Sequence, residues 1–205
     1  FFRFRPSVSL AATLLIIGAA TALQVYGTSC GILLTDDSFN YLSAGDSFRS
    51  AREFRSPDGT YFVAWPPLFP LILSLIPDPK TGMLVMNIVL KILLSILLYQ
   101  IASRLIQDKT IQIVFLIVTV CGVHLTMISV FLWSELLFLL MLIVNGILAI
   151  WVRQSDKYIA PFFLAGFLLC LQRYAGVFVV GAMTLWLITD RVVQLRRRVI
   201  LSVLY

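Results

Sequence analysis

The feature that most constrains this chain is a series of apolar runs, each about as long as a membrane is thick. A helix needs about 20 apolar residues to cross the hydrocarbon core. Four runs meet this length, residues 7–27, 82–106, 111–131 and 134–152. Charged residues make up only 13% of the 205 residues, about half the share that a soluble domain carries. The sequence therefore predicts an all-α integral membrane protein and excludes a water-soluble one.

A further apolar run, residues 158–189, is too long for one upright span. Its 32 residues would extend about 50 Å as a helix. Gln172-Arg173 lies near the middle of this run, so a continuous helix would put an arginine at mid-membrane. A break at this point gives two short spans instead. With the break we expect six spans in total, an amino terminus in the cytoplasm, and residues 28–81 as a large outer loop.

The distribution of basic residues favours the break, because Lys and Arg are more frequent in cytoplasmic loops than in outer ones. With six spans, ten basic residues are cytoplasmic and five face outward, while Lys91 lies within a span. The cytoplasmic set is Arg3, Arg5, Arg104, Lys109, Arg153, Lys157, Arg191, Arg196, Arg197 and Arg198, and the outer set is Arg49, Arg52, Arg55, Lys80 and Arg173. The net charge of +6 thus reports topology and does not indicate a nucleic-acid partner.

The chain reads as one membrane domain over residues 1–205, in a bacterial inner membrane or a membrane of the endoplasmic reticulum type. No Met begins it, and residues 199–205 are apolar like the start of a seventh span. We expect it to be the amino-terminal part of a longer protein.

The outer loop contains two stretches that are typical of short helices at the membrane surface. Phe39, Tyr41, Leu42 and Phe48 alternate with polar residues, which favours an amphipathic helix lying in the interface. Residues 66–76 are apolar but too short to cross, and Pro77-Asp78-Pro79 follows them. They predict an interfacial or re-entrant helix, which at membrane depth must lie against protein or a wet cavity.

Asp36 and Asp37 stand at the start of this loop's first helix. Such a pair suits a general base or a site for a divalent cation such as Mg²⁺ or Mn²⁺. The alternative is structural, with Asp37 capping a short helix through Asn40 and Tyr41. Adjacent side chains diverge by about 100° on a helix, so only one of the two is expected to face a reacting atom.

Two further carboxylate or cationic groups are expected at the same membrane face. Glu135 begins the fourth span at its outer end, where it either favours a helix amino terminus or serves as another carboxylate. Arg173 is predicted at the outer face, where arginine suits a phosphate. The expected meeting of Asp36, Asp37, Glu135 and Arg173 at one face depends on the topology given above.

Three other residues are candidates for substrate contacts. Lys91 lies near mid-membrane on a polar stripe with Asn87, Ser95 and Tyr99, and such a stripe is expected to face inward. It would contact a lipid phosphate, or snorkel, or bond to a neighbouring helix. Tyr41 and Trp65 would stack on a sugar, or anchor the loop at the interface.

The order of these motifs resembles the amino-terminal half of the GT-C glycosyltransferases, polytopic enzymes that use polyprenyl-phosphate sugars. The chain is similar in particular to bacterial members akin to the dolichyl-phosphate-mannose protein mannosyltransferases. The matching segments are Thr35-Asp36-Asp37-Ser38-Phe39-Asn40-Tyr41, Trp65-Pro66-Pro67-Leu68-Phe69-Pro70-Leu71, Ser134-Glu135-Leu136-Leu137-Phe138 and Gln172-Arg173-Tyr174-Ala175-Gly176.

This resemblance implies a membrane enzyme whose donor is a polyprenyl-phosphate sugar and whose acceptor is a hydroxyl group. It implies that Asp36 is the catalytic base and that Asp37 assists through acceptor or metal contacts, with a divalent cation in many members. The family's later spans and soluble domain are not in this sequence. The alternatives are a non-catalytic accessory subunit of a larger membrane complex and, more weakly, a transporter subunit, since no inverted repeat is evident.

Overall fold

The computed structural model describes residues 10–189. Over this range the chain is helical, and its only extended pairings are two isolated bridges. The predictions for Arg3, Arg5, the start of the first span at Ser7, Arg191, Arg196, Arg197, Arg198 and residues 199–205 lie outside the described residues. Two compact units divide the chain, the first being Phe1–Asn40 with Ile76–Leu137 and the second Tyr41–Leu75 with Phe138–Tyr205. The prediction of a single membrane domain is not tested by this division.

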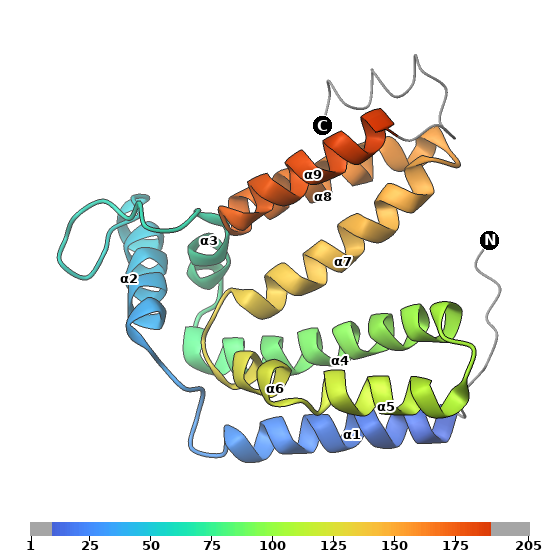
Figure 1. The fold of residues 1–205 in the computed structure, drawn as a ribbon. Coiled ribbons are helices and arrows are strands. Elements are labelled where there is room, and N and C mark those ends of the chain that lie inside the picture. Colours follow the sequence, from blue (N-terminus) through green and yellow to red (C-terminus); the bar gives the residue numbers. More distant parts are fainter. Residues whose placement is uncertain (1–9, 190–205) are drawn as a thin grey trace. The chain divides into compact units, whose positions relative to one another are not determined.

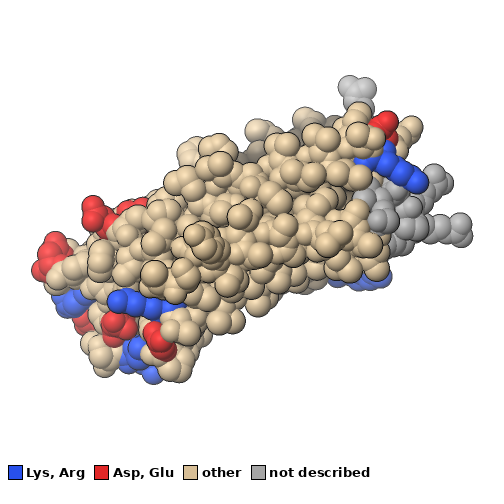
Figure 2. Space-filling model, turned by 90° about the horizontal axis from the view of Figure 1, so that it is seen from below, with Lys and Arg blue, Asp and Glu red and all other residues tan. Residues whose placement is uncertain are grey.

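Four helical segments of the described residues are long and apolar enough to cross a membrane. They are Leu10–Gly27 (α1), Pro79–Leu105 (α4), Lys109–Val130 (α5 and α6 together) and Glu135–Val152 (α7). Figure 2 shows wide areas of the surface that carry no Lys, Arg, Asp or Glu. The predicted all-α class is therefore confirmed, with four helical segments whose length and composition suit a membrane.

The long apolar run after residue 158 is interrupted where the sequence predicts a break. A short 3₁₀ turn (Asp156–Tyr158) leads into α8 (Ile159–Gln172), and α9 (Ala175–Thr189) begins after two intervening residues. These helices of 14 and 15 residues are each about 22 Å long, shorter than the hydrocarbon core. The total of six spans stays a prediction.

The first unit is a bundle of α1, α4, α5 (Lys109–Val120) and α6 (Val123–Val130), and Figure 1 shows α1, α4 and α5 side by side. Asp78 caps α4 by accepting from the Lys80 backbone N–H, and the Thr81 side chain holds the pKa of Asp78 below its usual value. The predicted third span is interrupted, since α5 ends at Val120 and α6 begins at Val123. Gly122 suits this junction because a Cβ there would overlap the Val118 carbonyl oxygen.

Polar side chains inside this bundle cap the carboxyl end of α6. The Asn87 Nδ2 donates to the Ser129 carbonyl at 3.1 Å and to the Phe131 carbonyl at 2.9 Å. The Gln24 Nε2 also donates to the Ser129 carbonyl, at 2.9 Å. The last carbonyls of a helix have no partner within it, so these amides stabilise the end of α6.

Lys91 is buried in the same bundle, where its Nζ donates to the Ala20 carbonyl of α1 at 3.0 Å. Asn87, Ser95 and Tyr99 are buried with it, so the predicted inward polar face of α4 is confirmed. Of the three alternatives for Lys91, hydrogen bonding to a neighbouring helix is the arrangement that the structure has.

We expect the substitution Asn87→Leu to lower the free energy of unfolding by about 1–3 kcal/mol, since it removes a buried donor from two carbonyls. Denaturant-induced unfolding in detergent micelles measures this loss. Val89→Leu, at a half-exposed position two residues further along α4, is the matched control and is expected to leave stability unchanged. Equal stability of the two variants would contradict the capping role.

The second unit holds most of α2 (Asp36–Ala51), α3 (Leu68–Leu75), most of α7, and the pair α8 and α9. Gly45 lets α2 approach α3, because a Cβ there would lie only 3.1 Å from the Leu73 Cβ. Arg49 then caps α3, donating to the Leu73 and Ser74 carbonyls at 3.0 and 2.9 Å. The short helix predicted over residues 66–76 is thus present, and its membrane depth stays a prediction.

Ala149, Val152, Phe162 and Leu187 form the buried core that joins α7, α8 and α9. α8 lies along α9 in Figure 1.

Candidate functional site

The two candidate catalytic carboxylates form the first turn of α2 in the first unit. Asp36 is exposed and Asp37 is half-buried. Thr35 precedes the helix, and its backbone N–H donates to the Ser38 Oγ at 3.0 Å, which is half of a capping box. Thr35 and Ser38 therefore cap the helix. The alternative in which Asp37 caps it is wrong, because Asp37 is the second residue within α2. Both carboxylates lie in the first turn of the helix, at the positive end of its dipole.

The start of α2 is joined to the segment that precedes α7. Leu33 and Phe131 form a parallel bridge, with the Leu33 N–H donating to the Val130 carbonyl and the Leu132 N–H to the Leu33 carbonyl, both at 2.9 Å. The Ser38 Oγ also donates to the Leu132 carbonyl, at 3.0 Å. These bonds connect positions almost a hundred residues apart and hold the first turn of α2 beside the entry to α7.

Trp133 completes this junction, since its Nε1–H donates to the Thr35 Oγ1 at 2.8 Å. Glu135 follows two residues later, in the first turn of α7. The structure thus brings the helix starts that carry Asp36, Asp37 and Glu135 together within one unit. The sequence analysis gave Thr35, Ser38 and Trp133 no role, although threonine is a common residue directly before a helix.

We expect Trp133→Phe to loosen the start of α2 while keeping the ring stacked on Phe131, which lies 4.5 Å away between centroids. The variant loses one partly buried hydrogen bond, worth about 1 kcal/mol. Hydrogen exchange of the amides in residues 35–40 is expected to quicken. Thr35→Val removes the other partner, so the double variant should be no less stable than the worse single one. Additive losses would contradict a direct bond between these side chains.

In the second unit, Tyr41 and Trp65 belong to an aromatic cluster. The Tyr41 ring centroid lies 4.8 Å from that of Phe69, 5.4 Å from that of Trp65 and 6.1 Å from that of Phe62. Tyr41 is only 2% exposed, whereas Trp65 is half-buried. Both rings pack the outer-loop segment onto α2 and α3, and a role in stacking on a sugar stays a prediction for each.

Arg173 ends α8 as its carboxyl-terminal cap and is half-buried. The neighbouring Tyr174 hydroxyl donates to the Val63 carbonyl at 2.9 Å. Within the second unit, the turn that carries Arg173 is therefore tied to the loop segment that carries Trp65. The predicted meeting of Arg173 with Asp36, Asp37 and Glu135 at one membrane face stays a prediction, as does the contact of Arg173 with a phosphate.

The basic residues of the outer loop contact side chains of the same stretch. The Arg55 Nη2 lies 2.6 Å from the Glu53 Oε2, which raises the pKa of Arg55, and its guanidinium stacks over the Tyr61 ring. The Arg49 Nη1 lies 3.4 Å from the Asp46 Oδ1. Arg52 lies over the Phe48 ring. These contacts favour a structural role for the stretch.

The residues present do not make a metal site of ordinary composition. Between residues 10 and 189 no group of three or more His, Cys, Asp or Glu side chains is placed to hold an ion. Asp36 and Asp37 alone would supply two carboxylates that diverge along the helix.

Over the described residues the chain is a helical protein with four segments long and apolar enough to cross a bilayer. Comparisons of the chain with protein-family models, with curated proteins and with solved structures find no match.

Proposed function

We propose that the protein is a membrane glycosyltransferase that moves a sugar from a polyprenyl-phosphate donor to a hydroxyl acceptor on the non-cytoplasmic side. The observation that carries this proposal is the placement of Asp36. Its carboxylate is exposed in the first turn of a helix whose start is held by Thr35, Ser38 and Trp133. A general base needs such a fixed and accessible position.

In the proposed reaction Asp36 accepts the proton of the acceptor hydroxyl as its oxygen attacks the anomeric carbon of the sugar. The new carbon–oxygen bond forms on the face opposite the phosphate, and the bond from the anomeric carbon to the phosphate oxygen breaks. Polyprenyl phosphate leaves with the electron pair of the broken bond. Because attack and departure take place on opposite faces of the anomeric carbon, the configuration of the sugar inverts. Asp37 and Glu135 would bind acceptor hydroxyls near this base.

The leaving phosphate gains negative charge, which a cation stabilises best in a water-poor site. From the sequence we assign this role to Arg173, at the outer end of α8. Lys91 is not used, because its ammonium bonds to the Ala20 carbonyl inside the bundle. The proposed topology places the amino terminus in the cytoplasm and both α2 and the turn at Arg173 outside.

Purified protein in liposomes, given polyprenyl-phosphate sugars with a labelled sugar, tests the proposal. We expect label to leave the lipid and to appear on a hydroxyl acceptor with inverted anomeric configuration. A panel of donors with different sugars and of acceptors, including peptides and lipids with free hydroxyls, identifies the substrates. If no donor in the panel loses its labelled sugar, the proposal is contradicted.

A second candidate function is that of a non-catalytic subunit in a larger membrane complex. Tyr61 and Val63 favour it, because they are 64% and 75% exposed on the outer loop and would suit a contact with another protein. Copurification of one partner in constant ratio, with no turnover of any donor, would support this alternative.

A further inference from the structure

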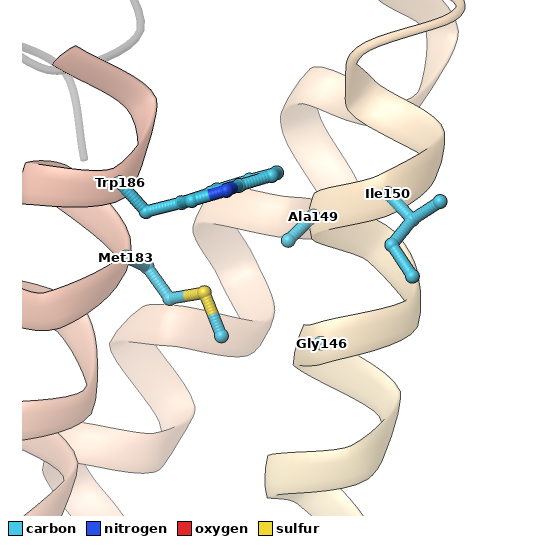
Figure 3. Close-up of a pocket in the computed structure, with 5 residues that line it drawn as sticks. All are labelled: Gly146, Ala149, Ile150, Met183 and Trp186. Carbon is cyan, nitrogen blue, oxygen red and sulfur yellow. The ribbon is translucent and has the colours of Figure 1, made fainter. Parts of the chain in front are cut away.

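An apolar groove lies between α7 and α9 in the second unit. It is lined by Gly146, Ala149 and Ile150 of α7 and by Met183 and Trp186 of α9. Figure 3 shows Met183 and Trp186 projecting from α9 toward α7. The hollow measures about 270 Å³, somewhat less than the pockets of roughly 300–1,000 Å³ that enclose a whole drug-sized ligand. This size suits a segment of a hydrocarbon chain.

The groove is open where it passes Gly146. A Cβ added at Gly146 would have no heavy atom within 4 Å, so the helix surface there faces empty space. Gly146 belongs to α7, one of the helices long and apolar enough to cross a membrane. In a bilayer this space is filled by hydrocarbon, because none of the lining residues carries a charge that would hold water.

The guanidinium of Arg153 stands at one end of the groove. The Arg153 guanidinium lies over the ring of Trp186, 5.4 Å from its centroid, and Trp186 itself lines the groove. Lys157 lies 4.8 Å from the centroid of the Tyr158 ring, a few residues further on. Asp156 lies between them in the sequence, so residues 153–157 contain two basic residues and one acidic residue. Arg153 directly follows the last residue of α7, where the phosphate groups of a bilayer are expected.

We propose that this groove binds an acyl chain of an anionic glycerophospholipid whose phosphate contacts Arg153. Gly146 precedes Arg153 by seven residues, which is about 10 Å along a helix. The upper part of an acyl chain spans this distance when its headgroup lies at Arg153. Basic sites between membrane helices bind anionic headgroups by the same combination of charge and apolar contact. The five N–H groups of arginine let it bind a phosphate alongside its other contacts.

Fluorescence quenching by lipids with brominated acyl chains tests this site, since bromine quenches a tryptophan only at close range. The protein is reconstituted into phosphatidylcholine bilayers that contain a small fraction of brominated phosphatidylglycerol or, in parallel, brominated phosphatidylcholine. The contribution of Trp186 is the difference between the wild-type protein and Trp186→Phe. We expect phosphatidylglycerol to quench Trp186 several-fold more than phosphatidylcholine does at the same fraction.

Two variants separate the acyl chain from the headgroup. Gly146→Leu fills the groove without a clash and is expected to reduce quenching by both lipids, while Gly18→Leu, at a glycine of α1 that also faces open space, is expected to have no effect. Arg153→Gln is expected to abolish the preference for phosphatidylglycerol. As a control, the thermal unfolding of each variant is measured to establish that it is folded.

Equal quenching by the two lipids, or quenching that Gly146→Leu leaves unchanged, would overturn the proposal. So would a protein dimer that Gly146→Leu dissociates, because a second copy would then occupy the groove. Displacement of quenching by polyprenyl phosphate but not by unbrominated phosphatidylglycerol would also overturn it, in favour of an isoprenoid chain. A negative result in the quenching experiment would not contradict the proposed sugar transfer, because no step of that reaction uses the groove.

Discussion

Asp36→Asn is expected to lower the rate of sugar transfer by about 10²–10⁴-fold, the usual contribution of a general base. The amide has the size of the carboxylate but cannot accept the acceptor's proton. The exposed position of Asp36 means that the change removes no packing, so the unfolding temperature should stay the same. Initial rates of label transfer in liposomes, measured beside thermal unfolding, test both expectations.

Asp46→Asn is the matched control for this prediction. Asp46 lies on the same helix, is exposed, and forms a 3.4 Å ion pair with Arg49. We expect nearly full activity from this variant. Transfer by Asp36→Asn at the wild-type rate would remove the assignment of the base, and equal loss in both variants would point to a general effect of charge on α2.

Gly176→Ala is expected to cause the largest loss of stability of any substitution considered for this chain, about 3 kcal/mol. α8 ends at Gln172 and α9 begins at Ala175, so the two helices meet within a very short turn. A Cβ at Gly176 would overlap the carbonyl carbon and oxygen of Leu169, which are backbone atoms and cannot rotate away. The turn must open to admit a methyl group, and the contacts between α8 and α9 are then weakened.

Gly181→Ala provides the comparison, because a Cβ at Gly181 meets nothing within 4 Å on the same helix. That variant is expected to be as stable as the wild type or slightly more so, since alanine favours a helix by about 1 kcal/mol over glycine. Thermal unfolding in one detergent measures both variants. If Gly176→Ala unfolds at the wild-type temperature, the close approach of the two helices is not as described.

Much of the helical structure, including one helix boundary and one buried helix face, could be predicted from local properties of the sequence. The break at Gln172-Arg173 follows from a run too long to cross once and from polar residues at its middle. The inward face of α4 follows from Asn87, Lys91, Ser95 and Tyr99 recurring every four residues. Both arguments use only spacing along one helix and the cost of exposing polar groups to lipid.

The candidate site was less predictable because its geometry depends on pairings distant in sequence. The bonds of Ser38 to Leu132 and of Trp133 to Thr35 join segments separated by 94 and 98 positions. No local pattern indicates such partners. Tyr41 illustrates the same limit, since an aromatic residue on a polar helix suggested a surface role, whereas Phe62, Trp65 and Phe69 surround it.

The central claim is that Asp36 and Arg173 both face the non-cytoplasmic side, where the base and the phosphate-binding cation can serve one reaction. Labelling of single cysteines tests it directly, after Cys30, Cys121 and Cys170 are replaced by alanine. Asp36→Cys and Arg173→Cys are each expressed in cells and treated from outside with a thiol reagent that cannot cross membranes. The account predicts that both cysteines are labelled in intact cells. Labelling of one of them only after the membrane is opened would place the two residues on opposite sides and contradict the proposed enzyme.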